Sequence, residues 1–358
     1  MSYFVGVDVG GTTTTIAIGD GDRNILHVSP QFETRSAEGP QATISAIVQE
    51  ILAGLKSLGI SPIDVAQIGL ATPGPATLDG VLNNTPNLNP ELWNNFAARQ
   101  TLQEAMQLVA KDVAVHYIGD GQAAALGEYS IRNEMVVWSK AQLDKSSDKS
   151  SGQNLMSLFM VIVGTGLGGG AVQNGGPVRG SQGRAGHAGH IFLPADAFRY
   201  EHDRQLRVGN AVSTVESAVS LTALTHQLGF RLGLDQWQEH PLKSAPGSMR
   251  EKAKQLRELA ANGDELALEL FDDQARALGI GLLAVNYVGD YDLLVIGGGV
   301  CDLTSELKTR YKATAENAYR ESSLDGFRNL EHIEFSLCGD EAAVVGALAH
   351  AYASDVQQ

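Results

Sequence analysis

The sequence has little cysteine, few positive charges and no long apolar run. Its two cysteines, Cys301 and Cys338, are far apart and lie in no metal-ligand spacing, so buried thiols are expected instead of a disulfide or a zinc site. Lys and Arg number 26 against 41 Asp and Glu, and the net charge of −15 argues against nucleic acid or an anionic membrane surface as a partner. No segment approaches the length of a membrane span and no signal-like segment opens the chain, which makes a soluble cytoplasmic protein the expectation.

The composition is that of a globular protein with ample material for a core. Hydrophobic residues make up 43% of the 358 residues and charged residues 19%. A chain of this length exceeds the size at which a single core keeps growing, so two domains or lobes are expected. The acidic charge still permits an anionic nucleotide as a ligand, because a few backbone amides can bind phosphate.

The stretch Gly119-Asp120-Gly121 joins an apolar run, 113–118, to an Ala-rich segment, 122–128. The β-branched residues of the run predict a strand, and the Ala-rich segment predicts a helix. An acid at this junction lies at the carboxyl end of a strand, where ligands bind in open α/β sheets. Asp is also a preferred helix N-cap, so Asp120 taken alone is either a capping residue or a catalytic carboxylate.

Two glycine-rich turns each join an apolar strand to a further strand. The first is Gly10-Gly11-Thr12 and the second is Gly164-Thr165-Gly166. Each is followed by the signal of a two-residue hairpin, Asp20-Gly21 in one case and Asn174-Gly175 in the other. Equivalent residues of the two segments are 154 positions apart, which predicts a duplicated architecture.

These turns suit phosphate binding. The second formally matches the dinucleotide fingerprint, but a strand follows where that site needs a helix, and no Gly-Lys-Ser/Thr completes a Walker-type loop. What remains is binding of phosphate by backbone amides, with the hydroxyls of Thr12, Thr13 and Thr165 as further donors, or else a pair of ordinary glycine turns. Asp8 precedes the first turn, where a carboxylate suits Mg²⁺ near bound phosphates or simply stabilises the turn.

The rest of the chain alternates between strand and helix patterns. Further strands are expected at 65–71, 291–296 and 331–336. Helices are expected at 41–58, 102–108, 212–228, 248–262, 265–288 and 341–352. The polar patch at 139–153 is expected to form a solvated loop.

Six motifs occur in an order that resembles the ROK family of bacterial sugar kinases and sugar-responsive repressors. They are Asp8–Thr12, Thr72–Pro75, Gly119–Glu128, Gly164–Gly169, Gly186–His190 and Ile296–Val300, and the resemblance covers residues 3–353. It implies an α/β, two-lobed actin/hexokinase-like (ribonuclease H-like) duplicated fold with a cleft between the lobes. The first lobe would comprise residues 1–118 with the closing helix at about 341–354, and the second would comprise 119–340 with helical insertions.

The resemblance also implies roles for individual residues. Asp120 would be the general base that accepts the proton of a sugar hydroxyl as its oxygen attacks the γ-phosphate of ATP. Mg²⁺, with Asp8 as its ligand, and the ATP phosphates would be held by Asp8, Gly10, Gly11, Thr12, Thr13, Gly164, Thr165 and Gly166. The adenosine would lie near Gly297, Gly298 and Gly299. The sugar would contact Gly74, Asn87, Gly119, Asp120, His187, His190 and Glu216.

The sequence departs from the family at the sugar-binding positions. Family members usually have Asn immediately before the catalytic Asp and Glu three residues before the histidine that corresponds to His190; here these positions are Gly119 and His187. The family's Cys-rich zinc loop is absent, since 204–210 contains no cysteine, so no structural zinc is expected. A site built to bind specific hydroxyls discriminates strongly against mismatches, so the substrate need not be glucose.

Two hypotheses follow. The first is an ATP-dependent carbohydrate kinase with a small-molecule sugar substrate, and the second is a sugar-binding regulatory protein of the family that has lost catalysis. A repressor of the family would carry a helix-turn-helix before the first strand, and the chain begins at that strand, so a nucleic-acid partner is not expected. Family members are often dimers or tetramers, which makes a homodimer an expectation from the resemblance alone.

Overall fold

The computed structural model describes residues 2–139, 154–327 and 333–355. The predicted solvated loop therefore lies outside the described residues, except for its first residue. The chain forms two compact units. The first comprises 1–160, 170–186 and 336–358, and the second comprises 161–169 and 187–335. These bounds differ from those expected from the sequence, because the helix that begins at Asp120 packs with the first unit.

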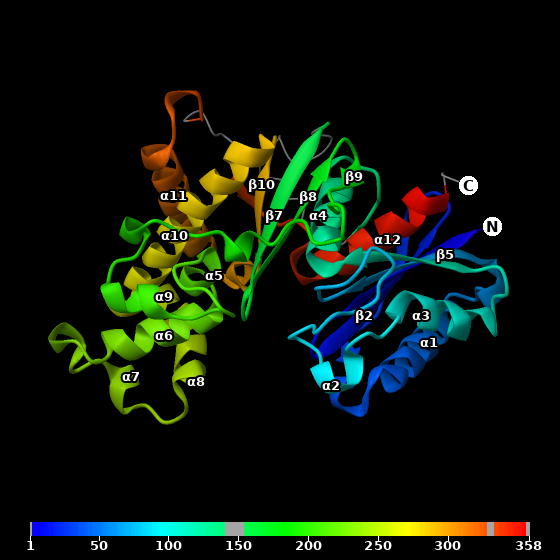
Figure 1. The fold of residues 1–358 in the computed structure, drawn as a ribbon, viewed down its shortest axis with the longest axis horizontal. Helices are drawn as coiled ribbons and strands as arrows, with labels where there is room; N and C mark the ends of the chain where they lie inside the picture. The colour runs from blue at the N-terminus through cyan, green and yellow to red at the C-terminus, as the bar shows by residue number, and fades with distance from the viewer. Residues whose placement is uncertain (1, 140–153, 328–332, 356–358) are drawn as a thin grey trace. The chain divides into compact units, whose positions relative to one another are not determined.

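The first unit is built on a mixed sheet with the order β3-β2-β1-β5-β6 (Figure 1). Its strands are β1 (Tyr3–Val9), β2 (Thr13–Asp20), β3 (Ile25–Val28), β5 (Val65–Thr72) and β6 (Ala114–Gly119), and β4 (Phe32–Glu33) also pairs with β2. The strands β1, β2 and β3 form an antiparallel meander, whereas β5 is parallel to both β1 and β6. The predicted strands and the first hairpin are therefore present, and β3 and β4 were not predicted.

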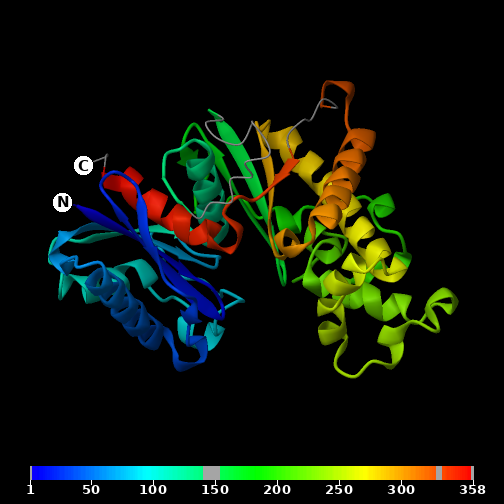
Figure 2. The same cartoon turned by 180° about the vertical axis from the view of Figure 1, so that it is seen from behind.

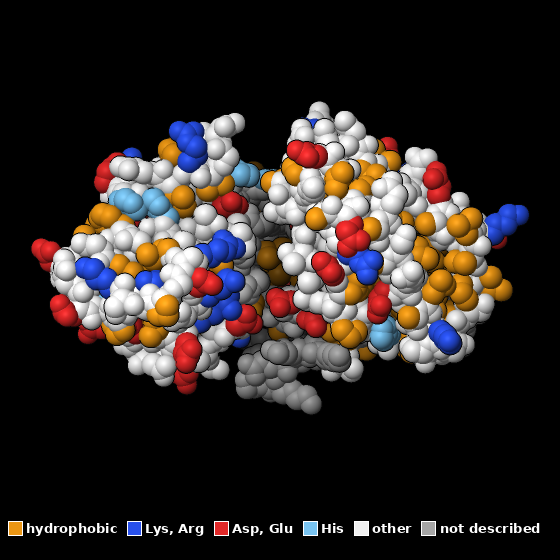
Figure 3. Space-filling view, turned by 90° about the horizontal axis from the view of Figure 1, so that it is seen from below, with side chains coloured by type: hydrophobic (Ala, Val, Ile, Leu, Met, Phe, Trp, Pro, Cys, Tyr) orange, Lys and Arg blue, Asp and Glu red, His pale blue; other side chains and the backbone are white. Residues whose placement is uncertain are grey.

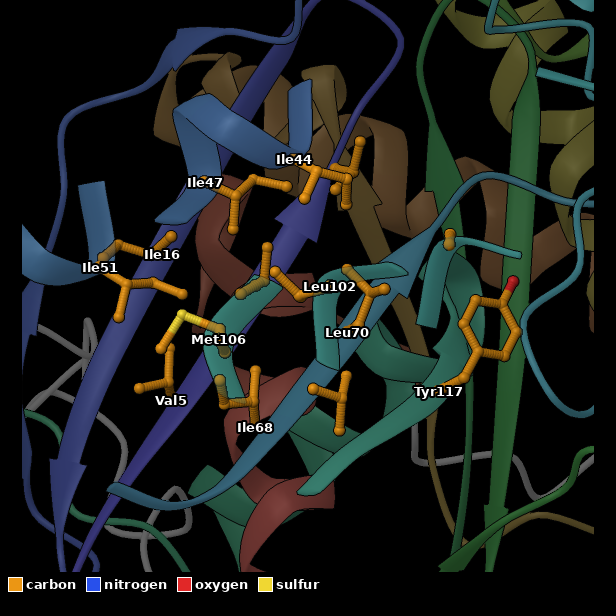
Figure 4. Close-up of a cluster of buried hydrophobic side chains, with 14 of the residues drawn as sticks. Val5, Ile16, Ile44, Ile47, Ile51, Ile68, Leu70, Leu102, Met106 and Tyr117 are labelled. Atoms are coloured by element: carbon orange, nitrogen blue, oxygen red, sulfur yellow. The ribbon is translucent and has the colours of Figure 1, made fainter. Parts of the chain in front are cut away.

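Helices cover both faces of this sheet, as Figures 1 and 2 show. On one face lie α1 (Pro40–Ser57) and α3 (Ala98–Gln107), with the short α2 (Pro90–Trp93) beside them. Apolar side chains of α1 and α3 form one buried cluster with alternate residues of the strands, since successive strand residues point to opposite faces. Figure 4 shows members of this cluster, among them Val5, Ile16, Ile47, Ile68 and Leu102.

The other face of the sheet is covered by α12 (Ala342–Asp355), which also packs against α4 (Asp120–Arg132). Glycines permit this close approach, because a Cβ atom at Gly127 would overlap the backbone of α12 and one at Gly346 would overlap the carbonyl of Ala123 on α4. The helix that carries Asp120 is therefore fixed to the sheet through α12.

We expect Gly346→Ala to destabilise the protein. The added methyl group has no room beside the Ala123 carbonyl, and relieving the overlap requires the backbones of α4 and α12 to separate. Overpacking of this kind costs about 2 kcal/mol or more, which would lower the midpoint of urea unfolding. Gly326→Ala is the matched control, since no atom lies within 4 Å of a Cβ atom built there. Equal midpoints for the two variants would contradict the packing argument.

The second sheet has the order β11-β10-β7-β8-β9, and the division between the units falls within β7 (Ser157–Val163) and β8 (Leu167–Gln173). The other strands are β9 (Gly176–Pro177), β10 (Leu294–Gly298) and β11 (Ile333–Phe335). Taken from the opposite edge, as β9-β8-β7-β10-β11, this order matches that of the first sheet strand for strand. The first strand of each sheet ends, and the second begins, at positions 154 residues apart, so the predicted duplication is present in the structure.

The helices of the second unit correct several expectations. The helix expected at 212–228 is two helices, α5 (Val215–Ala218) and α6 (Leu221–Arg231), because Ser220 breaks the pattern and caps α6. The helix expected at 248–262 is likewise divided at Gln255 into α8 (Met249–Lys254) and α9 (Leu256–Ala261). The long α10 (Glu265–Gly289) follows the prediction, whereas α7 (Pro241–Ser244) and the polar α11 (Ser305–Ser322) were not predicted.

None of the helices within residues 2–139, 154–327 and 333–355 combines the length and the apolar character that crossing a membrane requires.

Candidate active site

The first unit brings the ends of three parallel strands to one edge of its sheet. In the register of the sheet, Asp8 of β1 lies opposite Ala71 of β5, and Ala71 lies opposite Ile118 of β6. Asp8, the loop that begins after Thr72 and contains Gly74, and Gly119-Asp120 therefore lie at the same edge. This is the edge at which open α/β sheets bind ligands.

Asp120 does not occupy the helix cap. The N-cap of α4 is Gly119, with extended backbone at φ −69° and ψ 147°, and Asp120 is the first residue of the helix. The Oδ1 atom of Asp120 accepts a hydrogen bond of 2.7 Å from the N–H of Gly121. An acid in the first turn interacts favourably with the helix dipole at the start of α4.

Asp8 and Asp120 influence each other electrostatically. Burial raises the pKa of Asp8 to about 7, and the negative charge of Asp120 contributes to the increase. A carboxylate with a strongly raised pKa near a second carboxylate is typical of catalytic and metal-binding sites. The arrangement is suited to a divalent cation, because a cation would offset the repulsion between the two groups.

The first glycine turn, Gly10–Thr12, is held by its neighbours. The N–H of Gly10 donates to the carbonyl of Thr13 at 2.8 Å. Thr34 secures the other side, since its hydroxyl donates to the carbonyl of Gly10 at 2.8 Å and its N–H donates to the carbonyl of Thr12 at 2.9 Å. A Cβ atom at Gly11 would meet the carbonyl oxygen of Asn87, so the loop that carries Asn87 lies directly against this turn.

The second glycine turn, Gly164–Gly166, is held at the N-terminus of α6. The N–H of Leu221 donates to the carbonyl of Gly164 at 2.9 Å. Thr222 donates to the carbonyl of Thr165 from its N–H at 3.3 Å and from its hydroxyl at 2.8 Å. Because the first amides of α6 are engaged by the turn, the groups in this unit that remain for phosphate are those of the turn itself and of nearby side chains.

Glu216 lies between the second turn and the Gly-His motif. Its Oε2 atom accepts a hydrogen bond of 2.8 Å from the N–H of Leu167, immediately after the turn. The carboxylate also lies beside Gly166 and Gly189, where a Cβ atom would approach it to within 2.9 Å and 3.3 Å respectively. The structure thus brings together, within the second unit, residues predicted separately for phosphate and for sugar binding.

The two histidines of the Gly-His motif are exposed and near each other. The rings of His187 and His190 are stacked, with centroids 6.3 Å apart and an interplanar angle of 17°. Across the described parts of the chain, no three His, Cys, Asp or Glu side chains are grouped so that they could hold a metal ion.

A pocket of about 340 Å³ lies within the second unit. Gly164 and Thr165 of the second turn line it together with Gly299, which follows β10. The neighbouring Gly298 has a φ of 77°, and a Cβ atom there would meet the carbonyl of Val163 at 2.5 Å, so the glycines are needed for this backbone to lie against β7. Two of the predicted nucleotide-binding segments therefore share one pocket of ligand-binding size.

Residues that the sequence did not single out also contribute to the candidate active site. Gln122 is only 4% exposed, and its amide nitrogen donates to the carbonyls of Gly183 and Ala185 at 3.2 Å and 3.1 Å. It thereby fixes, on the helix of Asp120, the segment that leads to His187. The sequence signal that could have identified Gln122 is its position as the one amide side chain in an Ala-rich helical segment. Arg250 of α8 and Arg257 of α9 belong to a helical region with no recognisable motif.

Comparison with known proteins decides the family. A model of the ROK family matches residues 4–353. The chain belongs to the ROK family. It is 26% identical over 352 residues to a glucokinase of Halalkalibacterium halodurans, a match that covers 96% of this chain and 93% of that protein.

Solved structures agree on the fold of this ROK-family chain. The ROK hexokinase from Thermus thermophilus is 25% identical, with a TM-score of 0.74, and the match covers 99% of this chain and 100% of that one. A ROK family glucokinase from Streptomyces griseus, solved in complex with glucose and AMPPNP, is 23% identical with a TM-score of 0.72, covering 98% and 99% of the two chains. The predicted family and the predicted α/β fold of the actin/hexokinase type are confirmed.

Proposed function

We propose that this ROK-family protein is an ATP-dependent sugar kinase with Asp120 as the general base. The observation that carries the proposal is that Asp8 and Asp120 lie at one edge of the first sheet, where open α/β sheets bind ligands, close enough to influence each other electrostatically. The glucokinase relative and the nucleotide- and glucose-bound structure support the same class of reaction.

Phosphoryl transfer requires little of the protein beyond positioning of the reactants and stabilisation of the developing charge. A sugar hydroxyl would donate its proton to the carboxylate of Asp120 while its oxygen forms a bond to the γ-phosphorus and the bond to the β-phosphate oxygen breaks, releasing ADP. The amides of the two glycine turns, with the hydroxyls of Thr12, Thr13 and Thr165, would orient the phosphates. Gly299 and the pocket beside it would receive the nucleoside.

The site also fits Mg²⁺, and Asp8 is the residue proposed to hold it. The raised pKa of Asp8 reflects burial and the nearby negative charge of Asp120, both of which a cation would counteract. When bound, Mg²⁺ offsets the charge that develops on the transferred phosphoryl group.

The sugar would contact Gly74, Asn87, Asp120, His187, His190 and Glu216. Because Gly119 and His187 replace an amide and a carboxylate that the family resemblance implies, the substrate is proposed to differ from glucose. A regulatory protein that binds sugar without catalysis is the second candidate, and the same two positions favour it.

A panel of hexoses, amino sugars and polyols tests the function. Each compound is assayed for ADP release in the presence of Mg²⁺ and ATP, and separately for its effect on the melting temperature. Turnover of at least one compound is expected. If a sugar raises the melting temperature and none is phosphorylated, the regulatory candidate replaces the kinase.

We expect Gly119→Asn to restore recognition of a glucose-like sugar. The backbone of Gly119 is ordinary for any residue, and a Cβ atom there would meet only the side chain of Gln122 at 3.6 Å, so the variant should fold like the wild type. One added hydrogen bond is worth roughly 1 kcal/mol, which corresponds to a decrease of about fivefold in KM for glucose. Gly119→Ala fills the same space without the amide and should bring no gain. Similar KM values for the two variants would show that the amide is irrelevant.

A further inference from the structure

A short basic segment borders the pocket of the second unit. Residues 249–257 contain four Lys or Arg residues and a single acid, in a chain whose net charge is −15. Two of these cations, Lys254 of α8 and Arg257 of α9, line the pocket itself. Figure 3 shows Lys and Arg side chains (blue) gathered over the unit that carries these helices. A local excess of positive charge in an acidic protein indicates an anionic partner.

Arg250, also on α8, connects this segment to the second glycine turn. Its Nη2 atom donates a hydrogen bond of 3.0 Å to the hydroxyl of Thr165, and Thr165 lines the pocket. Arg250 is exposed, so its guanidinium is accessible beside the turn. A guanidinium carries five N–H donors in a planar fork, and one group can therefore hold Thr165 and bind an anion at the same time.

Two acids lie near the segment, and neither neutralises Arg250. Glu251 accepts hydrogen bonds from both the N–H and the hydroxyl of Ser248, in the capping box that starts α8. Asp302 pairs with Arg257 at 2.8 Å, but both side chains are largely exposed, where such pairs contribute little and exchange readily. The guanidinium of Arg257 lies over Gly299, where a Cβ atom would overlap its Nη2 atom, so this charge is placed at the pocket wall.

We propose that Arg250, together with Lys254 and Arg257, binds the phosphate chain of the donor nucleotide. The inference rests on the proposed kinase function and adds the residues that recognise the polyanion. The apolar and glycine-lined part of the pocket, with Phe271 and Gly299, takes the nucleoside. Arg250 then lies beside the Thr165 turn, where it provides a charge-assisted hydrogen bond to a phosphate oxygen, and Lys254 and Arg257 add positive charge from the pocket wall.

Nucleotide binding measured directly tests the inference. A fluorescent ATP analogue (trinitrophenyl-ATP) is titrated into the full-length wild type and into Arg250→Met, and ATP, AMP and inorganic tripolyphosphate are used as competitors. Loss of the charged contact is expected to weaken ATP binding by about tenfold to a hundredfold, since a hydrogen bond to a charged group has that effect on affinity. AMP should bind nearly equally to both proteins, because it lacks the phosphate chain.

Two further arms complete the design. Arg250→Lys retains the charge and loses the planar fork, so its affinity for ATP should fall between those of the wild type and Arg250→Met. Arg310→Met is the matched control, because Arg310 is an exposed arginine of the same unit that pairs with Asp272 instead of lining this pocket. If tripolyphosphate competes with the wild type as strongly as ATP does, the site recognises the phosphate chain from either source; if ATP competes far better, the nucleoside part of the pocket also contributes.

The possible failures are distinguishable. If the wild type binds ATP and Arg250→Met binds it equally well, the assignment of Arg250 is wrong while the kinase proposal stands. An equal loss of affinity for AMP and ATP would also overturn it, because the residue would then act on the nucleoside. If the wild type binds no nucleotide, the proposed function fails and this inference fails with it.

Discussion

Replacing Asp120 by Asn is expected to lower kcat for the productive sugar by about 10²–10⁴-fold, the usual contribution of a positioned general base. An amide at this position cannot accept the proton of the sugar hydroxyl. It can still accept the hydrogen bond that the N–H of Gly121 donates to Oδ1, so the start of α4 should remain intact. Steady-state assays of ADP release over a range of sugar concentrations measure the effect, and KM should change far less than kcat.

A matched control and a second measurement separate catalysis from folding in this experiment. Asp112→Asn removes an exposed acid just before β6 and should leave kcat unchanged. The affinity of Asp120→Asn for nucleotide should remain that of the wild type, because Asp120 is assigned to the acceptor. Turnover by Asp120→Asn at the rate of the wild type would remove Asp120 from the role of base.

Much of the fold could be predicted because its signals are local. The apolar run that ends at Val9, the three-residue glycine turn and the hairpin at Asp20-Gly21 predict β1 and β2, and the same pattern 154 residues later predicts β7 and β8. Short strands such as β4 and the polar helix α11 carry weak patterns of their own and are stabilised by packing, which a single sequence does not display. The division at Ser220 depends on a side-chain cap within an otherwise helical pattern, and the division at Gln255 has no such side-chain cap to mark it.

The residues of the candidate site also divide into those that local sequence patterns identify and those that they do not. Asp8, Asp120 and the glycine turns follow strands, and the rule that ligands bind at strand ends is sufficient to single them out. Their proximity depends on the register of β1, β5 and β6, which local patterns do not specify. Gln122 and Arg250 could not be predicted, because each acts through a contact with a residue 61 or more positions away.

Asp8→Asn is expected to stabilise the protein above neutral pH and to have a smaller effect as the pH falls towards 4. The pKa of Asp8 is raised from 3.8 to about 7 in the folded state, so the folded protein binds one more proton than the unfolded chain between these values. The stability of the wild type therefore falls as the pH rises through this interval, by up to about 4 kcal/mol when a shift of three units is converted at 1.36 kcal/mol per unit. Asn carries no charge at any pH and avoids this loss.

Urea unfolding of both proteins at pH 5 and pH 8 measures the effect. The free energy of unfolding of Asp8→Asn should exceed that of the wild type by a few kcal/mol at pH 8 and by less than half as much at pH 5, because at pH 5 the wild type has undergone only the first part of its loss of stability. Asp22→Asn, at an exposed acid of the first hairpin, should change the stability little at either pH. A difference between Asp8→Asn and the wild type that is the same at both pH values would show that Asp8 does not bind a proton near neutrality.

Binding of Mg²⁺ would relate the loss of stability on ionisation of Asp8 to the function of the site. A carboxylate that destabilises the fold when ionised is retained most readily where a ligand needs it, since functional sites commonly trade stability for activity. Mg²⁺ with a non-hydrolysable ATP analogue should therefore raise the melting temperature of the wild type at pH 8 more than that of Asp8→Asn, because binding to the folded state alone is stabilising. The same variant should lose most of its phosphorylation activity despite its greater stability. An Asp8→Asn protein that is more stable and still fully active would assign the raised pKa of Asp8 to packing and exclude it as the metal ligand.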